Sequence, residues 1–210
     1  MSSVNDGRRS AQARATRDLI VDTASALFHA NGYPATSLTA IAAGAGVVVQ
    51  TIYNAVGNKA AVLNAVLDRT VSGPNAPMAV PDFMRERMTA AGDSASAVAV
   101  LADWLAEVNP RAEKVFELIR QAAAVDPEIA ELERRRSLQR LENYREAAAT
   151  IRRRGALGHA ASDERTAATI FAIGHPEVFR SLTGGAGWSV ADYRAWLGAS
   201  LTAALAVSQH

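Results

Sequence analysis

The sequence contains no cysteine and no long apolar run, and each of these absences excludes a class of protein. Without cysteine there are no disulfides, thiolate metal sites or thiol nucleophiles, which fits a reducing compartment. No stretch approaches the ~18 consecutive apolar residues of a membrane-spanning helix, and the N-terminal residues lack the apolar core of an export signal. We therefore expect a cytoplasmic protein that does not interact with a membrane.

A strong excess of one charge is also missing, because the formal net charge is only +1. The charges are nevertheless unevenly distributed: residues 1–72 contain six Arg and Lys against four Asp, and the rest of the chain contains sixteen against seventeen acidic residues. A basic N-terminal segment suits the phosphate backbone of DNA, although many solvated termini have the same composition. The basic residues of this segment are Arg8, Arg9, Arg14 and Arg17.

Helical periodicity runs through almost the whole chain, and only Val47–Val49 looks like a strand. The sequence therefore predicts an all-α fold. Glycine and proline concentrate between residues 72 and 81, as in a linker. A chain of 210 residues is long enough for two domains, and we place them at 1–72 and 73–210.

Four helices are expected in the first domain. The first carries its apolar face at 20, 24, 27 and 28 and should stop at Asn31–Gly32. Ser37 is placed to cap the second helix, which should end where Gly46 supplies a left-handed backbone. A short third helix covers about 49–54, and Asn58 should cap the fourth.

The second domain should consist of helices divided by proline and glycine. Asn109–Pro110 and Asp126–Pro127 look like breaks between helices. Pro176 should interrupt a helix that begins near Asp163, and Ser189 with Asp192 forms a capping box before the last helix. The remaining helices are expected at about 82–91, 94–108, 111–125 and 127–154.

A helix, a turn containing glycine and a second short helix form the pattern of a DNA-binding helix-turn-helix, here from Leu38 to Asn54. Segment 17–67 closely resembles the N-terminal domain of the tetracycline-repressor (TetR) family. The residues that carry the resemblance, in the order and spacing of the family, are Ala24, Phe28, Gly32, Ile41–Ala42, Gly46–Val47, Tyr53 and Lys59.

The resemblance implies a homodimer that binds a palindromic operator in double-stranded DNA. It also implies a larger C-terminal helical domain that dimerises and binds a small apolar or amphipathic effector, which releases the repressor from DNA. No metal or cofactor is implied. Cooperation of two copies is physically reasonable, because one recognition helix covers only half of a palindromic site.

The expected DNA contacts fall into two groups. By the resemblance, Tyr53 and Lys59 contact phosphates, and the start of the second helix does so through Thr36, Ser37 and Thr39. The start and exposed face of the third helix should lie against base edges, where Gln50 can pair with adenine and Thr51 with thymine. The third-helix residues in this interface are Val48, Val49, Gln50, Thr51 and Asn54.

Three positions depart from the family pattern. Val48 stands where most members have a Ser or Thr that caps the recognition helix, and a missing cap costs roughly 0.5–2 kcal/mol. Val56 replaces an aromatic residue, and Ala60 replaces an acidic one. We therefore expect weak or conditional operator affinity.

The sensory residues are less sharply defined. Bulky and polar side chains in the second domain could line an effector pocket, or could be plain core. The candidates are Trp104, Phe116, Arg120, Gln121, Tyr144, Phe171, His175 and Phe179. Likewise, the stripe Leu197, Leu201, Ala204 and Leu205 fits either a dimer interface or an intramolecular core.

Two other functions compete with a DNA-binding regulator. An enzyme is disfavoured, since the four histidines show no ligand spacing, the Gly184–Gly187 run lacks the lysine of a phosphate loop, and there is no nucleophile elbow. A helical protein that binds a ligand or a protein partner, with a weakened helix-turn-helix, is the second alternative. Val48, which stands where a capping Ser or Thr is usual, is the residue that favours this alternative.

Overall fold

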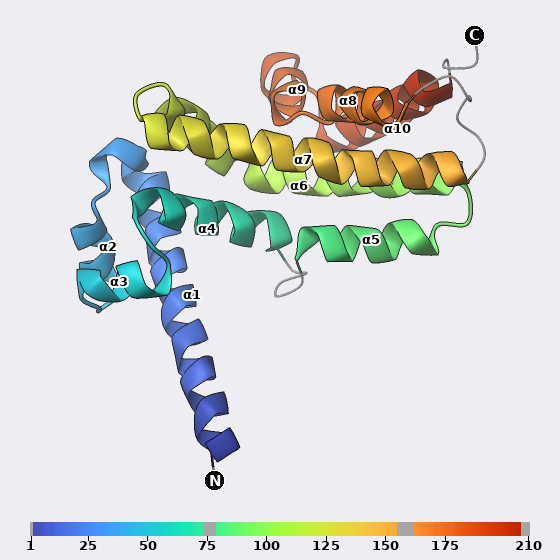
Figure 1. Ribbon diagram of the computed structural model, residues 1–210. Helices are drawn as coiled ribbons and strands as arrows, with labels where there is room; N and C mark the ends of the chain where they lie inside the picture. The colour runs from blue at the N-terminus through green and yellow to red at the C-terminus, as the bar shows by residue number, and fades with distance from the viewer. Residues whose placement is uncertain (1, 74–78, 155–161, 207–210) are drawn as a thin grey trace. The chain divides into compact units, whose positions relative to one another are not determined.

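The computed structural model describes residues 2–73, 79–154 and 162–206, and these ranges contain helices and no strand (Figure 1). The all-α prediction is therefore confirmed. Most of the linker expected at 72–81 falls on residues 74–78, outside the described ranges. Within those ranges no single helix is long and apolar enough to cross a membrane, and only the bent pair formed by Leu38–Gly44 and Val49–Ala55 reaches the required length and composition.

The chain folds as two compact units. The first comprises Met1–Thr70 together with Lys114–Glu133, and the second comprises Val71–Glu113 together with Arg134–His210. The N-terminal segment of the first unit ends at Thr70, whereas the sequence predicts a boundary at residue 72. The first unit also includes Lys114–Glu133, a segment that the sequence predicts for the second domain.

The first unit is built from α1 (Ser2–Ala35), α2 (Leu38–Gly44), α3 (Val49–Ala55) and α4 (Lys59–Ser72), with the end of α6 and the start of α7. Helices α1, α2 and α3 pack against one another (Figure 1). Ile20, Ala24 and Phe28 are buried on α1, as the 3–4 spacing predicts. Gly32 has φ +77° and kinks α1 at the position where the sequence predicts a stop.

Helix α1 begins much earlier than expected, at Ser2 rather than near Asp18. Alanine and arginine, which are strong helix formers, extend the helix toward the N-terminus. Residues 7–15 of this extension are exposed. Asp18 and Asp22 are both paired with Arg69 of α4, each at 2.9 Å.

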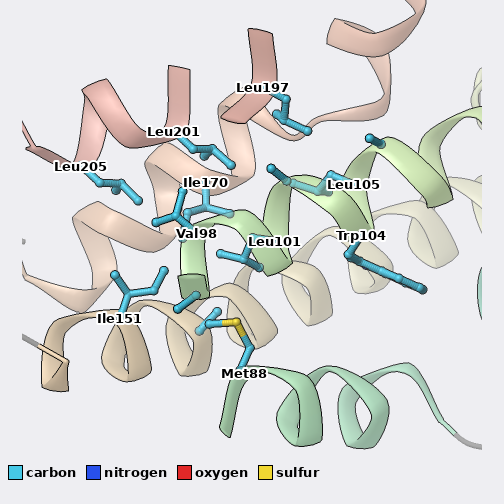
Figure 2. Close-up of a cluster of buried hydrophobic side chains, with 14 of the residues drawn as sticks. Met88, Val98, Leu101, Trp104, Leu105, Ile151, Ile170, Leu197, Leu201 and Leu205 are labelled. Carbon is cyan, nitrogen blue, oxygen red and sulfur yellow. The ribbon is translucent and has the colours of Figure 1, made fainter. Parts of the chain in front are cut away.

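The second unit contains α5 (Val80–Ala90), the first two-thirds of α6 (Ser94–Ala123), most of α7 (Pro127–Arg153), α8 (Asp163–Ile173), α9 (Pro176–Arg180), the π-helical segment η2 (Ser181–Gly185) and α10 (Val190–Ala206). Figure 2 shows side chains from α5, α6, α7, α8 and α10 meeting in one apolar core. Leu197, Leu201 and Leu205 are at most 3% exposed there, which favours the intramolecular alternative for this stripe.

Helix α6 is a single helix, whereas the sequence predicted two helices divided at Asn109–Pro110. Proline removes one backbone N–H but does not prevent packing on both sides of it. The Asn109 amide is buried, 2.9 Å from the Tyr193 hydroxyl and 3.3 Å from the Gly174 carbonyl oxygen, and so anchors the helix beside the proline. The predicted break at Pro176 and the Ser189–Asp192 capping box are both confirmed.

Candidate nucleic-acid interface

Helices α2 and α3 have the geometry of a helix-turn-helix, because their axes bend by 97° across the four-residue turn Ala45–Val48. The amide of Val47 donates to the Ala42 carbonyl at 2.9 Å, and that of Gly46 donates to the Ala43 carbonyl at 3.2 Å. This is a Schellman ending, which needs a left-handed residue, and Gly46 supplies φ +64°. The predicted role of Gly46 is confirmed.

The start of α2 contains one confirmed cap and one corrected contact. The Ser37 hydroxyl accepts a hydrogen bond from the Ala40 amide at 3.0 Å, as predicted, and Ser37 and Thr39 are exposed. Thr36 is only 2% exposed, and its hydroxyl donates to the carbonyls of Leu27 and Gly32. The structure therefore removes the Thr36 side chain from the candidate DNA contacts, because it is turned inward to close the kink of α1.

The exposed side of α3 carries the predicted base-reading residues. Ile52 is fully buried and fixes the helix on the unit, while Gln50 and Asn54 are exposed on the other side. Tyr53 is 51% exposed. The Gln50 amide nitrogen donates to the Asn54 side-chain oxygen at 3.0 Å, so these two residues form a pair one helical turn apart.

The start of α3 has no side-chain cap. Val48 has the extended backbone of a cap residue, with φ −87° and ψ 153°, but its side chain accepts no hydrogen bond and is 68% exposed. Val49 and Thr51, which follow it, are half-buried. The sequence prediction of an uncapped recognition helix is confirmed.

The start of α4 is fastened to the first turn of α7. The Asn58 side-chain oxygen accepts from the Ala61 amide at 2.9 Å, which confirms Asn58 as the cap of α4. Its amide nitrogen donates to the carboxylate of Glu128. The oxygen of the Asn58 side chain is therefore hydrogen-bonded within α4, and its nitrogen is hydrogen-bonded to α7.

Lys59 is half-buried next to this cap. Its ammonium lies 3.4 Å from the carbonyl oxygen of Pro34 and 4.1 Å from the centre of the Tyr33 ring. Burial lowers the pKa of Lys59, and the nearby carboxylate of Asp126 opposes that shift. The same carboxylate accepts a hydrogen bond from Tyr33, whose pKa is raised by burial first and by Asp126 second. The sequence offered no signal for these acidic partners.

The proposed effector residues separate into three groups. Trp104 and Phe179 are buried in the core of the second unit. Arg120 and Gln121 are exposed on α6, where both contact Glu117, so their expected place in apolar surroundings is wrong. They belong to the first unit, as does the half-buried Phe116.

Tyr144, Phe171 and His175 are the candidates that the structure brings together. The Phe171 ring centre lies 6.4 Å from that of Tyr144 and 5.4 Å from that of His175. The guanidinium of Arg140, which the sequence analysis missed, lies 5.4 Å from the same ring. Burial lowers the pKa of His175, and the charge of Arg140 adds to the effect. Arg140 could have been found from the sequence, because it lies four positions before Tyr144 on the same helix and so shares its face.

Comparison with known proteins supports the architecture of the site. Residues 20–66, which contain the whole helix-turn-helix, match the family model described as bacterial regulatory proteins, tetR family. No curated protein matches the chain.

Solved structures with the same fold cover nearly the entire chain. A Mesorhizobium loti protein described as a TetR-family transcriptional regulator has a TM-score of 0.69 at 22% identity, covering 93% of this chain and 97% of its own. NalD of Pseudomonas aeruginosa, a secondary repressor of the MexAB-OprM multidrug efflux pump, has a TM-score of 0.69 at 18% identity, covering 92% and 98%. SmeT in complex with triclosan has a TM-score of 0.68 at 22% identity, covering 90% and 91%. The helix-turn-helix segment of this chain thus matches the tetR family model, and most of the chain shares the fold of these solved structures.

Proposed function

We propose that this protein is a repressor that binds an inverted-repeat operator as a homodimer and is released by a small-molecule effector. The observation that carries the proposal is the polar face of α3, where Gln50 and Asn54 are exposed and paired while Ile52 anchors the helix. Amide side chains at such positions can read adenine edges in the major groove. Two copies are needed to cover both half-sites, with their centres about 34–36 Å apart.

Phosphate contacts would come from both sides of the recognition helix. Ser37 and Thr39 at the start of α2 and the hydroxyl of Tyr53 are exposed. Hydroxyl groups and lysine bind phosphate oxygens and set the position of a domain on the duplex without reading sequence. The exposed arginines of the α1 extension add positive charge to the same unit.

The effector would be held in the second unit, near Tyr144, Phe171 and His175. Their ring contacts and the neighbouring Arg140 combine apolar faces with polar groups, as effector pockets do. NalD is a repressor and SmeT was solved with triclosan, which makes a ligand-responsive repressor the natural model.

Selection of bound fragments from the source genome tests this proposal. We expect enrichment of an inverted repeat and gel-shift affinity that falls steeply with salt. Tyr53→Phe should weaken binding to all duplexes alike, since it removes a phosphate contact. Failure to enrich any fragment at low salt would overturn the proposal.

One observation favours a second function. The uncapped start of α3 at Val48 leaves the recognition helix less stable than a capped one. A protein that binds a ligand or a protein partner through its second unit, with a weakened helix-turn-helix, would tolerate this loss. Ligand binding without any DNA binding would favour that alternative.

A further inference from the structure

The turn between α6 and α7 presents two carboxylates to the helix-turn-helix. Asp126 caps α7, since its side chain accepts from the Glu128 amide at 2.9 Å and its carbonyl accepts from Ala130 at 3.0 Å. Asp126 and Glu128 are called the acidic corner below. Both belong to the first unit, although Glu128 lies 70 positions along the chain from Asn58 at the start of α4.

The acidic corner interacts with the helix-turn-helix framework at two places, the end of α1 and the start of α4. Glu128 accepts from the cap of α4, Asn58. Asp126 accepts from Tyr33 at the end of α1 and lies near the ammonium of Lys59. Glu128 is hydrogen-bonded directly to the start of α4, whereas Asp126 is bonded to Tyr33 and acts on Lys59 through its charge.

Three groups near the Lys59 ammonium attract a cation, while burial disfavours its charge. The Pro34 carbonyl oxygen lies at 3.4 Å, and the face of the Tyr33 ring at 4.1 Å offers a cation–π contact. Asp126 adds a negative charge. A DNA phosphate also attracts a cation, so it must compete with these three groups for the single ammonium of Lys59.

We propose that the acidic corner is an internal competitor of DNA phosphate, which holds Lys59 and the cap of α4 and thereby limits DNA affinity. This proposal rests on the proposed function, because it assumes that Lys59 contacts DNA. Burial has the larger influence on Lys59 and lowers its pKa, and the charge of Asp126 offsets part of that cost by stabilising the charged lysine. Release of Lys59 to an exposed phosphate would relieve part of that cost.

The internal contact can be tested without DNA, because Lys59 and Lys114 are the only lysines in the sequence. Protein labelled with 13C-lysine should give two resolved side-chain titrations by NMR. Asp126 raises the pKa of Lys59, so Asp126→Asn should move the Lys59 titration to lower pH and leave that of the exposed Lys114 unchanged. An unchanged Lys59 titration would overturn the proposal.

Affinity for DNA then tests the competition. Asp126→Asn and Glu128→Gln each remove a carboxylate charge while keeping an acceptor oxygen. Glu133→Gln is the matched control, since Glu133 is exposed on α7 and its replacement changes the net charge equally. At about 0.1 M salt, Asp126→Asn should bind duplex DNA about two- to fivefold more tightly than the control, the range of one partly exposed ion pair.

The effect should depend on Lys59. In a Lys59→Met background, Asp126→Asn should bind DNA no more tightly than Glu133→Gln does in that background. Thermal unfolding of each variant checks that α7 remains folded after its cap is changed. Binding by Asp126→Asn that is equal to or weaker than the control would instead mean that the acidic corner positions Lys59 for DNA, and would overturn the proposal.

Different results would overturn the proposed function and the competition proposal. If the wild type and every variant fail to bind any duplex at low salt, the proposed function fails and the competition proposal fails with it. If the wild type binds DNA and only the Asp126→Asn gain is missing, the proposed function survives and the competition proposal is overturned.

Discussion

Val48→Thr should stabilise the recognition helix. Val48 already has the backbone of a cap residue, with φ −87° and ψ 153°, but lacks an oxygen that could accept from the first amides of α3. Threonine has nearly the shape of valine and places a hydroxyl at the same branch point. Because Val48 is 68% exposed, the lost methyl group contributes little to packing.

The expected gain in the free energy of unfolding is the contribution of one side-chain cap. A side-chain cap contributes roughly 0.5–2 kcal/mol and typically about 1 kcal/mol. For a chain of 210 residues, 1 kcal/mol shifts the melting temperature by about 2–4 °C. If uncapped α3 must become ordered on DNA, the same free energy limits the gain in affinity to about fivefold.

Thermal and urea unfolding, with fluorescence anisotropy on duplex DNA, measure both effects. Val48→Ala is the matched control, because it removes the exposed apolar side chain without adding an oxygen. We expect Val48→Thr to be more stable than both the wild type and Val48→Ala. Equal melting temperatures for the Thr and Ala variants would refute the view that a side-chain cap at position 48 stabilises α3.

Three further predictions concern stability. Gly46→Ala should lower the free energy of unfolding by about 1–2 kcal/mol, because φ +64° is strained for alanine, and urea titration checks this. Asn109→Ala should cost about 1–3 kcal/mol, since it leaves the buried Tyr193 hydroxyl without its donor, and Tyr193→Phe in the same background should recover part of the loss in calorimetry. Burial lowers the folded-state pKa of His175, so stability should be fully present above about pH 6.5 and fall as the pH drops below it, because the unfolded chain takes up the proton first. His175→Asn keeps an acceptor for the Glu177 amide, and its unfolding free energy should depend less on pH between 7 and 5.

Local patterns predicted the helix-turn-helix well, because its turns are decided by neighbouring residues. The cap hydrogen bonds of Ser37 and Asn58 are each made three positions along the chain, and Gly46 acts through its own backbone. A hydroxyl or amide cap and a left-handed glycine are readable from sequence for that reason. The missing cap at Val48 was readable in the same way.

The continuation of α6 through Pro110 and the side to which its residues face were not predictable from the sequence. Pro110 looked like a break, but burial of Asn109 against Gly174 and Tyr193 carries α6 through it. Arg120 looked like a pocket residue, but the turn of α6 faces it outward toward Glu117. Such outcomes depend on which helix faces which, and a helical repeat alone does not specify the partner.

The acidic corner is the clearest example of this limit. Asp126 and Glu128 read only as the start of a helix, and nothing in their spacing connects them to Lys59 or Asn58. Folding places them beside the α4 cap within the first unit. A long-range electrostatic contact of this kind becomes visible only in the structure.

The central claim, that α3 reads DNA sequence, is tested most directly by the affinity of Gln50→Ala for a set of operators that differ at single base pairs. The wild type should discriminate at one or two positions of each half-site by about 1–3 kcal/mol. Gln50→Ala should lose that discrimination while keeping its affinity for random DNA, and Asn54→Ala should add little further loss because the two side chains are bonded to each other. Equal losses of affinity for operator and random DNA in Gln50→Ala would contradict the claim.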